Sequence, residues 1–86
     1  MKITLSKPLK LGEEEITELN LREPTAGDVM HCGYPLTIGD EVATPNAAVI
    51  GLLIARLSGI PPSGVKQLCV HDFQKCLQEV LSFFGE

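Results

Sequence analysis

The sequence has few aromatic residues and few residues of the kinds that hold nucleic acid. It contains one tyrosine, three phenylalanines and no tryptophan, which is too few for a surface that stacks bases. Seven lysines and arginines stand against eleven aspartates and glutamates, giving a formal net charge of -4, and the basic residues form no run. Binding to a phosphate backbone requires such a basic patch. The composition therefore argues against a nucleic-acid partner.

The sequence also lacks a hydrophobic run long enough to cross a membrane. A transmembrane helix needs ~20 apolar residues, and the most apolar stretch, residues 47–57, is about half that length. The N-terminus has no apolar core behind its lysine and does not resemble a secretory signal. With 44% hydrophobic and 21% charged residues, the chain is still apolar enough to fold. We expect one cytoplasmic domain over residues 1–86, with no membrane partner.

Cysteine and histidine are scarce and are spaced poorly for a metal site or a nucleophile. Structural zinc favours ligand pairs with two to four residues between them and a matching second pair. A cysteine nucleophile needs a base and a third orienting group, and the pattern provides neither arrangement. We therefore expect no metal, no cofactor and no catalytic residue, and a reducing compartment. The residues weighed are His31, Cys32, Cys69, His71 and Cys76.

Residues 1–23 are predicted to form an antiparallel β-hairpin. Ile3, Leu5 and Leu9 alternate loosely with polar residues, which is typical of a half-buried strand, and Gly12 marks the turn. Ile16 is out of phase with the later leucines of the second strand, so either a bulge intervenes or Ile16 belongs to the turn. The glutamates that crowd the hairpin are expected to be solvated rather than catalytic. They are Glu13, Glu14, Glu15, Glu18 and Glu23.

Two strands alone are marginally stable in water, so the hairpin must pack on helices. Residues 24–45 are predicted to form a short helix, at 26–32, and an irregular loop, at 33–45, which is rich in glycine, proline, threonine and aspartate. Thr25 followed by Asp28 resembles a capping box at the start of that helix. The predicted class is α+β, an N-terminal antiparallel β-hairpin packed on three α-helices.

Residues 46–86 are predicted to form the two longer helices. The first covers residues 47–57, begins after Asn46 and ends at Gly59. A single turn follows at residues 63–68, and Asp72 is expected to cap the last helix, residues 73–84. The last helix has the clearest helical periodicity in the chain.

These two helices carry more apolar surface than a small domain can easily cover. The helix at residues 47–57 is apolar nearly all round, which is typical of a buried helix. Its small side, with Ala47, Gly51 and Ala55, allows another helix to approach closely. Either this helix is the central element of the fold, or one of its sides meets a partner. Exposed apolar surface marks interaction sites, and the alternative is an ordinary covered core.

The order of these segments resembles the phage tail assembly chaperones. The segments are ITLSKPLKL, GEEE, ITELNLREPTAGDV, VIGLLIARLSGIP and VKQLCVHDFQKCLQEVLSFFG. The stretch at residues 19–28 is the most specific part of the resemblance. It is followed by the apolar helix, an "LSGI" end, a short turn and an aspartate that opens the final helix. These are fold signatures rather than catalytic motifs.

The resemblance implies a function without catalysis. Family members are encoded just ahead of the tape measure protein in Mu-like and other contractile-tailed phages. They bind that long helical protein and keep it soluble until the tail tube polymerises around it. Many copies coating one chain imply a homo-oligomer. The alternative is a small structural or adaptor protein that is retained in the virion tail.

A groove that accepts a partner helix requires apolar walls, and the central and final helices are the predicted source of them. We expect Arg56 at the rim of this groove. The predicted partner-binding residues are Val49, Leu52, Leu53, Arg56, Leu81, Phe83 and Phe84.

Overall fold

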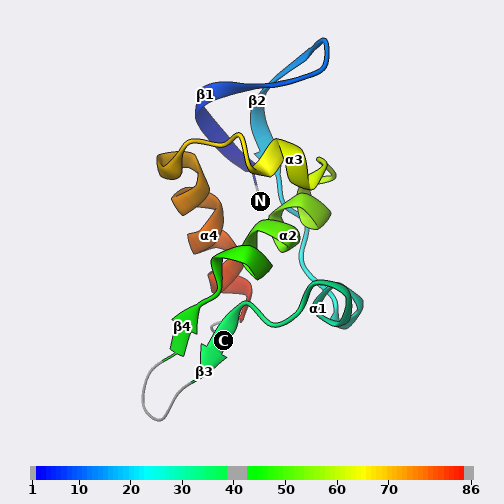
Figure 1. Ribbon diagram of the computed structural model, residues 1–86, viewed down its shortest axis with the longest axis vertical. Helices are drawn as coiled ribbons and strands as arrows, with labels where there is room; N and C mark the ends of the chain where they lie inside the picture. The colour runs from blue at the N-terminus through cyan, green and yellow to red at the C-terminus, as the bar shows by residue number, and fades with distance from the viewer. Residues whose placement is uncertain (1, 39–42, 85–86) are drawn as a thin grey trace.

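The computed structural model describes residues 2–38 and 43–84. Within these residues, two β-hairpins lie at opposite ends of the molecule, and four helices lie between them (Figure 1). The predicted α+β class, with an N-terminal antiparallel hairpin ahead of the helices, is confirmed. The elements are β1 (Lys2–Leu11), β2 (Glu14–Asn20), α1 (Ala26–Cys32), β3 (Leu36–Ile38), β4 (Ala43–Pro45), α2 (Ala47–Ser58), α3 (Pro62–Val65) and α4 (Val70–Phe84).

The N-terminal hairpin contains an irregularity in β1 rather than at Ile16. Thr4 lies opposite Glu18 and Leu9 lies opposite Ile16, so β1 has extra residues between these two pairs. Ile16 belongs to β2, where it is half-buried and lies opposite the buried Leu9. Gly12 has a φ of 62° in the turn, a left-handed conformation that glycine adopts without steric cost. The glutamates of the hairpin are exposed, as predicted.

Asp72 binds this bulge instead of capping the last helix. Helix α4 begins at Val70, so Asp72 lies inside its first turn. Its buried carboxylate accepts hydrogen bonds from the Ser6 N–H at 2.8 Å and the Lys7 N–H at 3.3 Å. Lys75 donates to the carbonyl of Thr4 at 3.2 Å. The prediction that Asp72 caps the helix is therefore wrong, because the bulged strand uses the carboxylate.

A second buried carboxylate, Asp28, joins the hairpin to two helices. It accepts from the Thr25 N–H at 2.8 Å, which confirms the predicted capping box. Arg22 donates to both of its oxygens, at 2.7 and 2.9 Å, and Arg56 of α2 donates at 2.6 Å. The hydrogen bond from Arg22 is the main cause that lowers the pKa of Asp28. These contacts explain why arginine and aspartate stand six residues apart in the REPTAGD stretch.

Residues 33–45 were expected to form an irregular loop, and the structure corrects this. β3 and β4 pair antiparallel, with Leu36 opposite Pro45 and Thr37 opposite Thr44. The Asn46 N–H donates to the carbonyl of Pro35 at 2.8 Å and closes the base of the hairpin. Three-residue strands carry too little periodicity to be read from sequence. Residues 39–42 of the expected loop lie outside the described residues.

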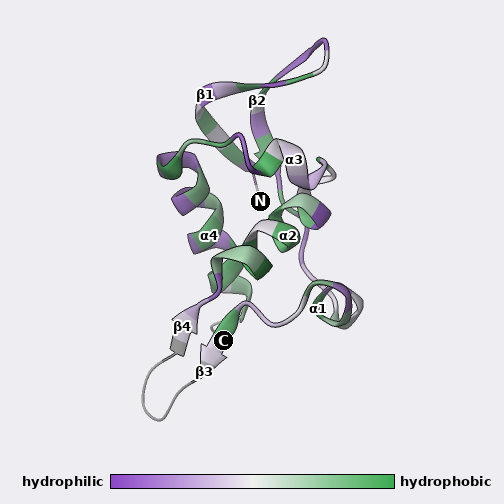
Figure 2. Ribbon diagram, in the orientation of Figure 1, coloured by the Kyte–Doolittle hydropathy of each residue, from purple (hydrophilic) through white to green (hydrophobic). Residues whose placement is uncertain are grey.

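Helix α2 is the central element of the fold, and it is hydrophobic over most of its length (Figure 2). Its large residues pack in the core, where the helix contacts β2 and α4. The buried apolar core consists of Ile3, Leu5, Leu9, Leu19, Leu21, Ile50, Leu53, Ile54, Ala55, Leu57, Val65, Cys76 and Val80.

Candidate partner-binding groove

Helix α2 begins and ends at the capping residues that the sequence predicts, Asn46 and Gly59. The Asn46 side chain accepts a hydrogen bond from the Val49 N–H at 3.3 Å, and Gly59 has a φ of 82° and follows the last turn. The large apolar residues of the helix, such as Leu53 and Ile54, are buried. Its small side is not covered in the same way, because Ala47 and Ala48 are exposed. Ala55, at the far end of this side, is buried in the core, so the part at Ala47, Ala48 and Gly51 remains available to another molecule.

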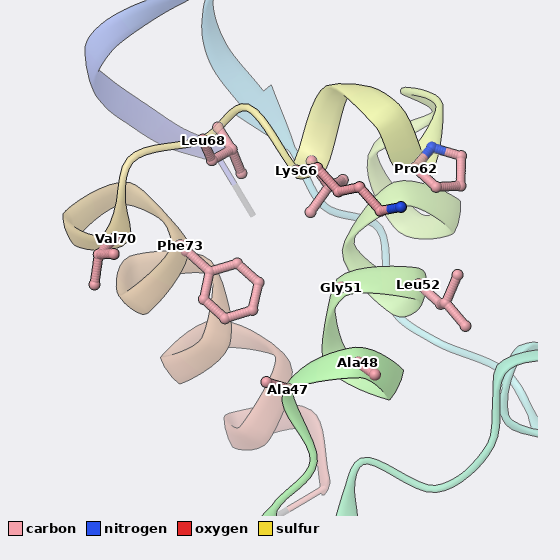
Figure 3. A pocket seen from close by; sticks show the side chains of 10 residues that line it. Ala47, Ala48, Gly51, Leu52, Pro62, Lys66, Leu68, Val70 and Phe73 are labelled. Carbon is pink, nitrogen blue, oxygen red and sulfur yellow. The ribbon is translucent and has the colours of Figure 1, made fainter.

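An apolar groove of about 460 Å³ lies along this small side. Its walls come from α2, from α3, from the segment that joins α3 to α4 and from the beginning of α4. Figure 3 shows Phe73 pointing from α4 towards Gly51 of α2 across the groove, with Leu68 and Lys66 along its upper edge. Sites that accept a drug-sized group or a side-chain cluster are typically ~300 to 1,000 Å³. The lining residues are Ala47, Ala48, Gly51, Leu52, Pro62, Val65, Lys66, Leu68, Val70 and Phe73.

Gly51 keeps the middle of this groove open. A Cβ at this position would lie 3.9 Å from Val65 Cγ1 and 4.0 Å from Phe73 Cε1, which is ordinary van der Waals contact. A methyl group therefore fits, whereas a longer side chain would extend into the groove. At the rims, Leu52 is 44% exposed and Val70 is 71% exposed. Together they border an apolar surface that solvent reaches.

A smaller hollow of about 180 Å³ lies on the other side of Leu52. Leu52 and Pro62 line both spaces, so Leu52 forms a ridge between them. Arg56 lines the hollow, and its hydrogen bond to Asp28 fixes its position. Cys32 is nearby, and burial raises the pKa of its thiol. A protonated thiol is a poor nucleophile.

Leu53 was predicted to bind a partner, but the structure buries it completely. Its side chain is 0% exposed and lies in the core. It follows Leu52 by one position, and adjacent residues on a helix point about 100° apart. Leu52 therefore faces the groove while Leu53 faces inward. Leu53 is removed from the partner-binding set for this reason.

The other predicted residues are spread over different parts of the molecule. Val49 is half-buried beside Gly33. A Cβ built on Gly33 would lie 3.5 and 3.7 Å from the two methyl groups of Val49. Phe84 meets the edge of the Tyr34 ring, with the ring centroids 5.5 Å apart. Leu81 is half-buried against the core, and Phe83 is half-buried near the end of α4. Leu52 is the member of the predicted set that lines the groove.

Most of the groove was not predicted. Val65, Leu68 and Phe73 form much of its wall, and helical periodicity alone gives no reason to bring them together. A usable signal was the small side of α2, since Ala47 and Gly51 both line the groove. That side was expected to let another helix approach closely.

The titratable residues do not gather around the groove. Within residues 2–38 and 43–84, no three histidine, cysteine or acidic side chains are placed so that they could hold a metal ion. Cys76 lies in the core, as its position on the apolar face predicts, and burial raises the pKa of its thiol to about 11. In the same described part of the chain, no helix combines the length and apolar character needed to cross a membrane.

The fold and this groove define a small α+β protein with an open apolar site bordered by helices. Over residues 2–85, the chain matches the family described as "Phage tail assembly chaperone proteins, E, or 41 or 14". The protein belongs to the phage tail assembly chaperone family, which confirms the resemblance in its sequence. No curated protein and no solved structure matches the chain.

Proposed function

We propose that this protein binds the tape measure protein in the host cytoplasm and keeps it soluble until the tail tube polymerises, without catalysing a reaction. Membership of the family supports a role in tail assembly. The observation that carries the finer proposal is the apolar groove along the small side of α2. A client that is long, helical and apolar would otherwise aggregate, and a groove of this kind covers part of its surface.

The groove suits a helix more than an extended segment. Within the described residues, its lining consists of side chains from three helices and from the segment between α3 and α4, so it presents no strand edge for main-chain hydrogen bonds. A helix satisfies its own backbone groups, so it can enter an apolar groove without leaving them unpaired. The alanines and Gly51 let such a helix approach the backbone of α2 closely.

Filling the groove should abolish the chaperone effect. We expect Ala48→Phe and Gly51→Leu each to reduce the soluble fraction of co-expressed tape measure protein severalfold, because the new side chains occupy the space of the client. The matched control is Gln78→Phe, which adds the same ring at an exposed position of α4 away from the groove. Solubility is measured as client in the supernatant after centrifugation.

Gly51→Ala separates blocking from unfolding. Its methyl group fits, and alanine in place of a helical glycine should raise the free energy of unfolding by about 0.5 to 1 kcal/mol. We expect this variant to retain client solubility. The proposal fails if folded Ala48→Phe protein keeps the client as soluble as the wild type does.

Self-association along the client is part of the same proposal, supported by the exposure of Met30, which lies outside the groove. Light scattering over a concentration series tests it, and a strict monomer at every concentration removes it.

Mass spectrometry of purified tails separates a chaperone, which is absent, from a virion component, which is present in stoichiometric amounts.

A further inference from the structure

The charged residue that lines the groove, within the described part of the chain, is Lys66. It follows α3, and its N–H donates to the carbonyl of Pro62 at 3.1 Å, which fixes the position of its backbone. Figure 3 shows its side chain reaching from α3 towards α2 along one rim of the groove. It makes no ion pair with any residue that the structure describes. A carboxylate from outside the chain can therefore approach its ammonium group.

The neighbouring hollow adds positive charge on the same side of the molecule. Arg56 lines that hollow and is 41% exposed. It shares the single carboxylate of Asp28 with Arg22, so this cluster carries a net charge of about +1 (two guanidinium groups and one carboxylate). Among the residues that the structure describes, no acidic side chain lines the groove or the hollow. The rim is thus positive, although the whole chain has a net charge of -4.

We propose that the occupant of the groove is an amphipathic helix whose apolar stripe is bordered by acidic side chains. The stripe lies against Ala48, Gly51 and Phe73, and the acidic side chains face Lys66 and Arg56. This inference rests on the proposed function, because it specifies which helices of the tape measure protein the chaperone selects. Charge at a rim of this kind determines selectivity more than total affinity.

The experiment uses overlapping peptides of 18 residues, a length chosen to give about five helical turns, that cover the tape measure protein. Binding is measured by fluorescence anisotropy for the wild type, for Lys66→Glu and for Lys10→Glu. Lys10→Glu makes the same change of net charge at an exposed position of β1 outside the groove. We expect the wild type to prefer peptides with an apolar stripe and an acidic flank.

Lys66→Glu should weaken the binding of peptides with an acidic flank by about three- to tenfold, because repulsion replaces an exposed ion pair. It should also improve the binding of peptides with a basic flank, and raised salt should reduce both effects. Lys10→Glu should bind each peptide with the same affinity as the wild type does.

Three outcomes would overturn the inference. The first is an unchanged peptide preference in Lys66→Glu, the second is an equal change in both variants, and the third is that the wild type binds no peptide. The co-expression assay is independent of all three. A client that stays soluble in that assay, and is lost with Ala48→Phe, supports the proposed function even where the charge preference is absent.

Discussion

Replacing Leu53 with alanine is expected to lower the free energy of unfolding by about 3 kcal/mol. The Leu53 side chain is 0% exposed in the middle of α2. Its removal takes away apolar contacts and leaves a cavity that the surrounding residues fill only in part. A domain of this size has a total stability of roughly 5 to 10 kcal/mol. Urea unfolding followed by circular dichroism measures the difference directly.

Leu52→Ala is the matched control for this prediction, because it removes the same atoms from the next position. Leu52 is 44% exposed and lines the groove. We expect Leu52→Ala to lower the free energy of unfolding by less than about 1 kcal/mol, because the solvent-exposed part of the Leu52 side chain contributes little to burial. We also expect this variant to reduce the solubility of the client. Equal losses of stability in the two variants would contradict the assignment of Leu53 to the core and Leu52 to the groove.

Asp72→Ala is expected to lower the free energy of unfolding by about 3 kcal/mol as well. The carboxylate of Asp72 is buried and accepts hydrogen bonds from the N–H groups of Ser6 and Lys7. Without it, the exposed bulge of β1 loses two hydrogen bonds to a charged acceptor, and such a bond contributes about 1.5 to 3 kcal/mol. Lys75 also loses its neighbouring charge, at 3.9 Å. Urea unfolding at pH 7 gives the magnitude.

The same carboxylate makes stability depend on pH in a predictable direction. Burial tends to raise the pKa of Asp72, but the hydrogen bonds from Ser6 and Lys7 outweigh burial and hold the pKa at about 2 in the folded protein. The unfolded pKa is higher, near 3.8, so the contribution is present above pH 5 and is lost as the pH falls towards 2. The stability difference between wild type and Asp72→Ala should therefore shrink over that range. A difference that stays constant from pH 7 to pH 2 would show that the carboxylate charge has no part in it.

The local features of the fold follow from the sequence because they depend on neighbouring residues. Asn46 and Gly59 mark the ends of α2, and the pair of Thr25 and Asp28 marks the start of α1, as their chemistry predicts. Asp72 has the same chemistry as a helix cap, yet it binds a strand 65 and 66 residues away. Nothing local distinguishes the two uses. A bulge and its partner become visible only when the strand and the helix are brought together.

The position of the groove could be predicted only in part for a similar reason. The periodicity of α2 separates a small side from a large side, and both sides are apolar. Which of them is covered depends on where β1, β2 and α4 pack. The large side, which includes Leu53, forms the core, and the small side at Gly51 stays open. The end of α4 was predicted to line a site, but Phe84 instead packs against Tyr34.

Site-specific photocrosslinking tests most directly whether the small side of α2 holds the client. A benzophenone amino acid is introduced at Ala48, beside the groove, or at Gln78, on the exposed side of α4, in cells that co-express the tape measure protein. We predict a covalent adduct of chaperone and tape measure protein from position 48 on irradiation, and little or none from position 78. An adduct from position 78 together with none from position 48 would contradict the account.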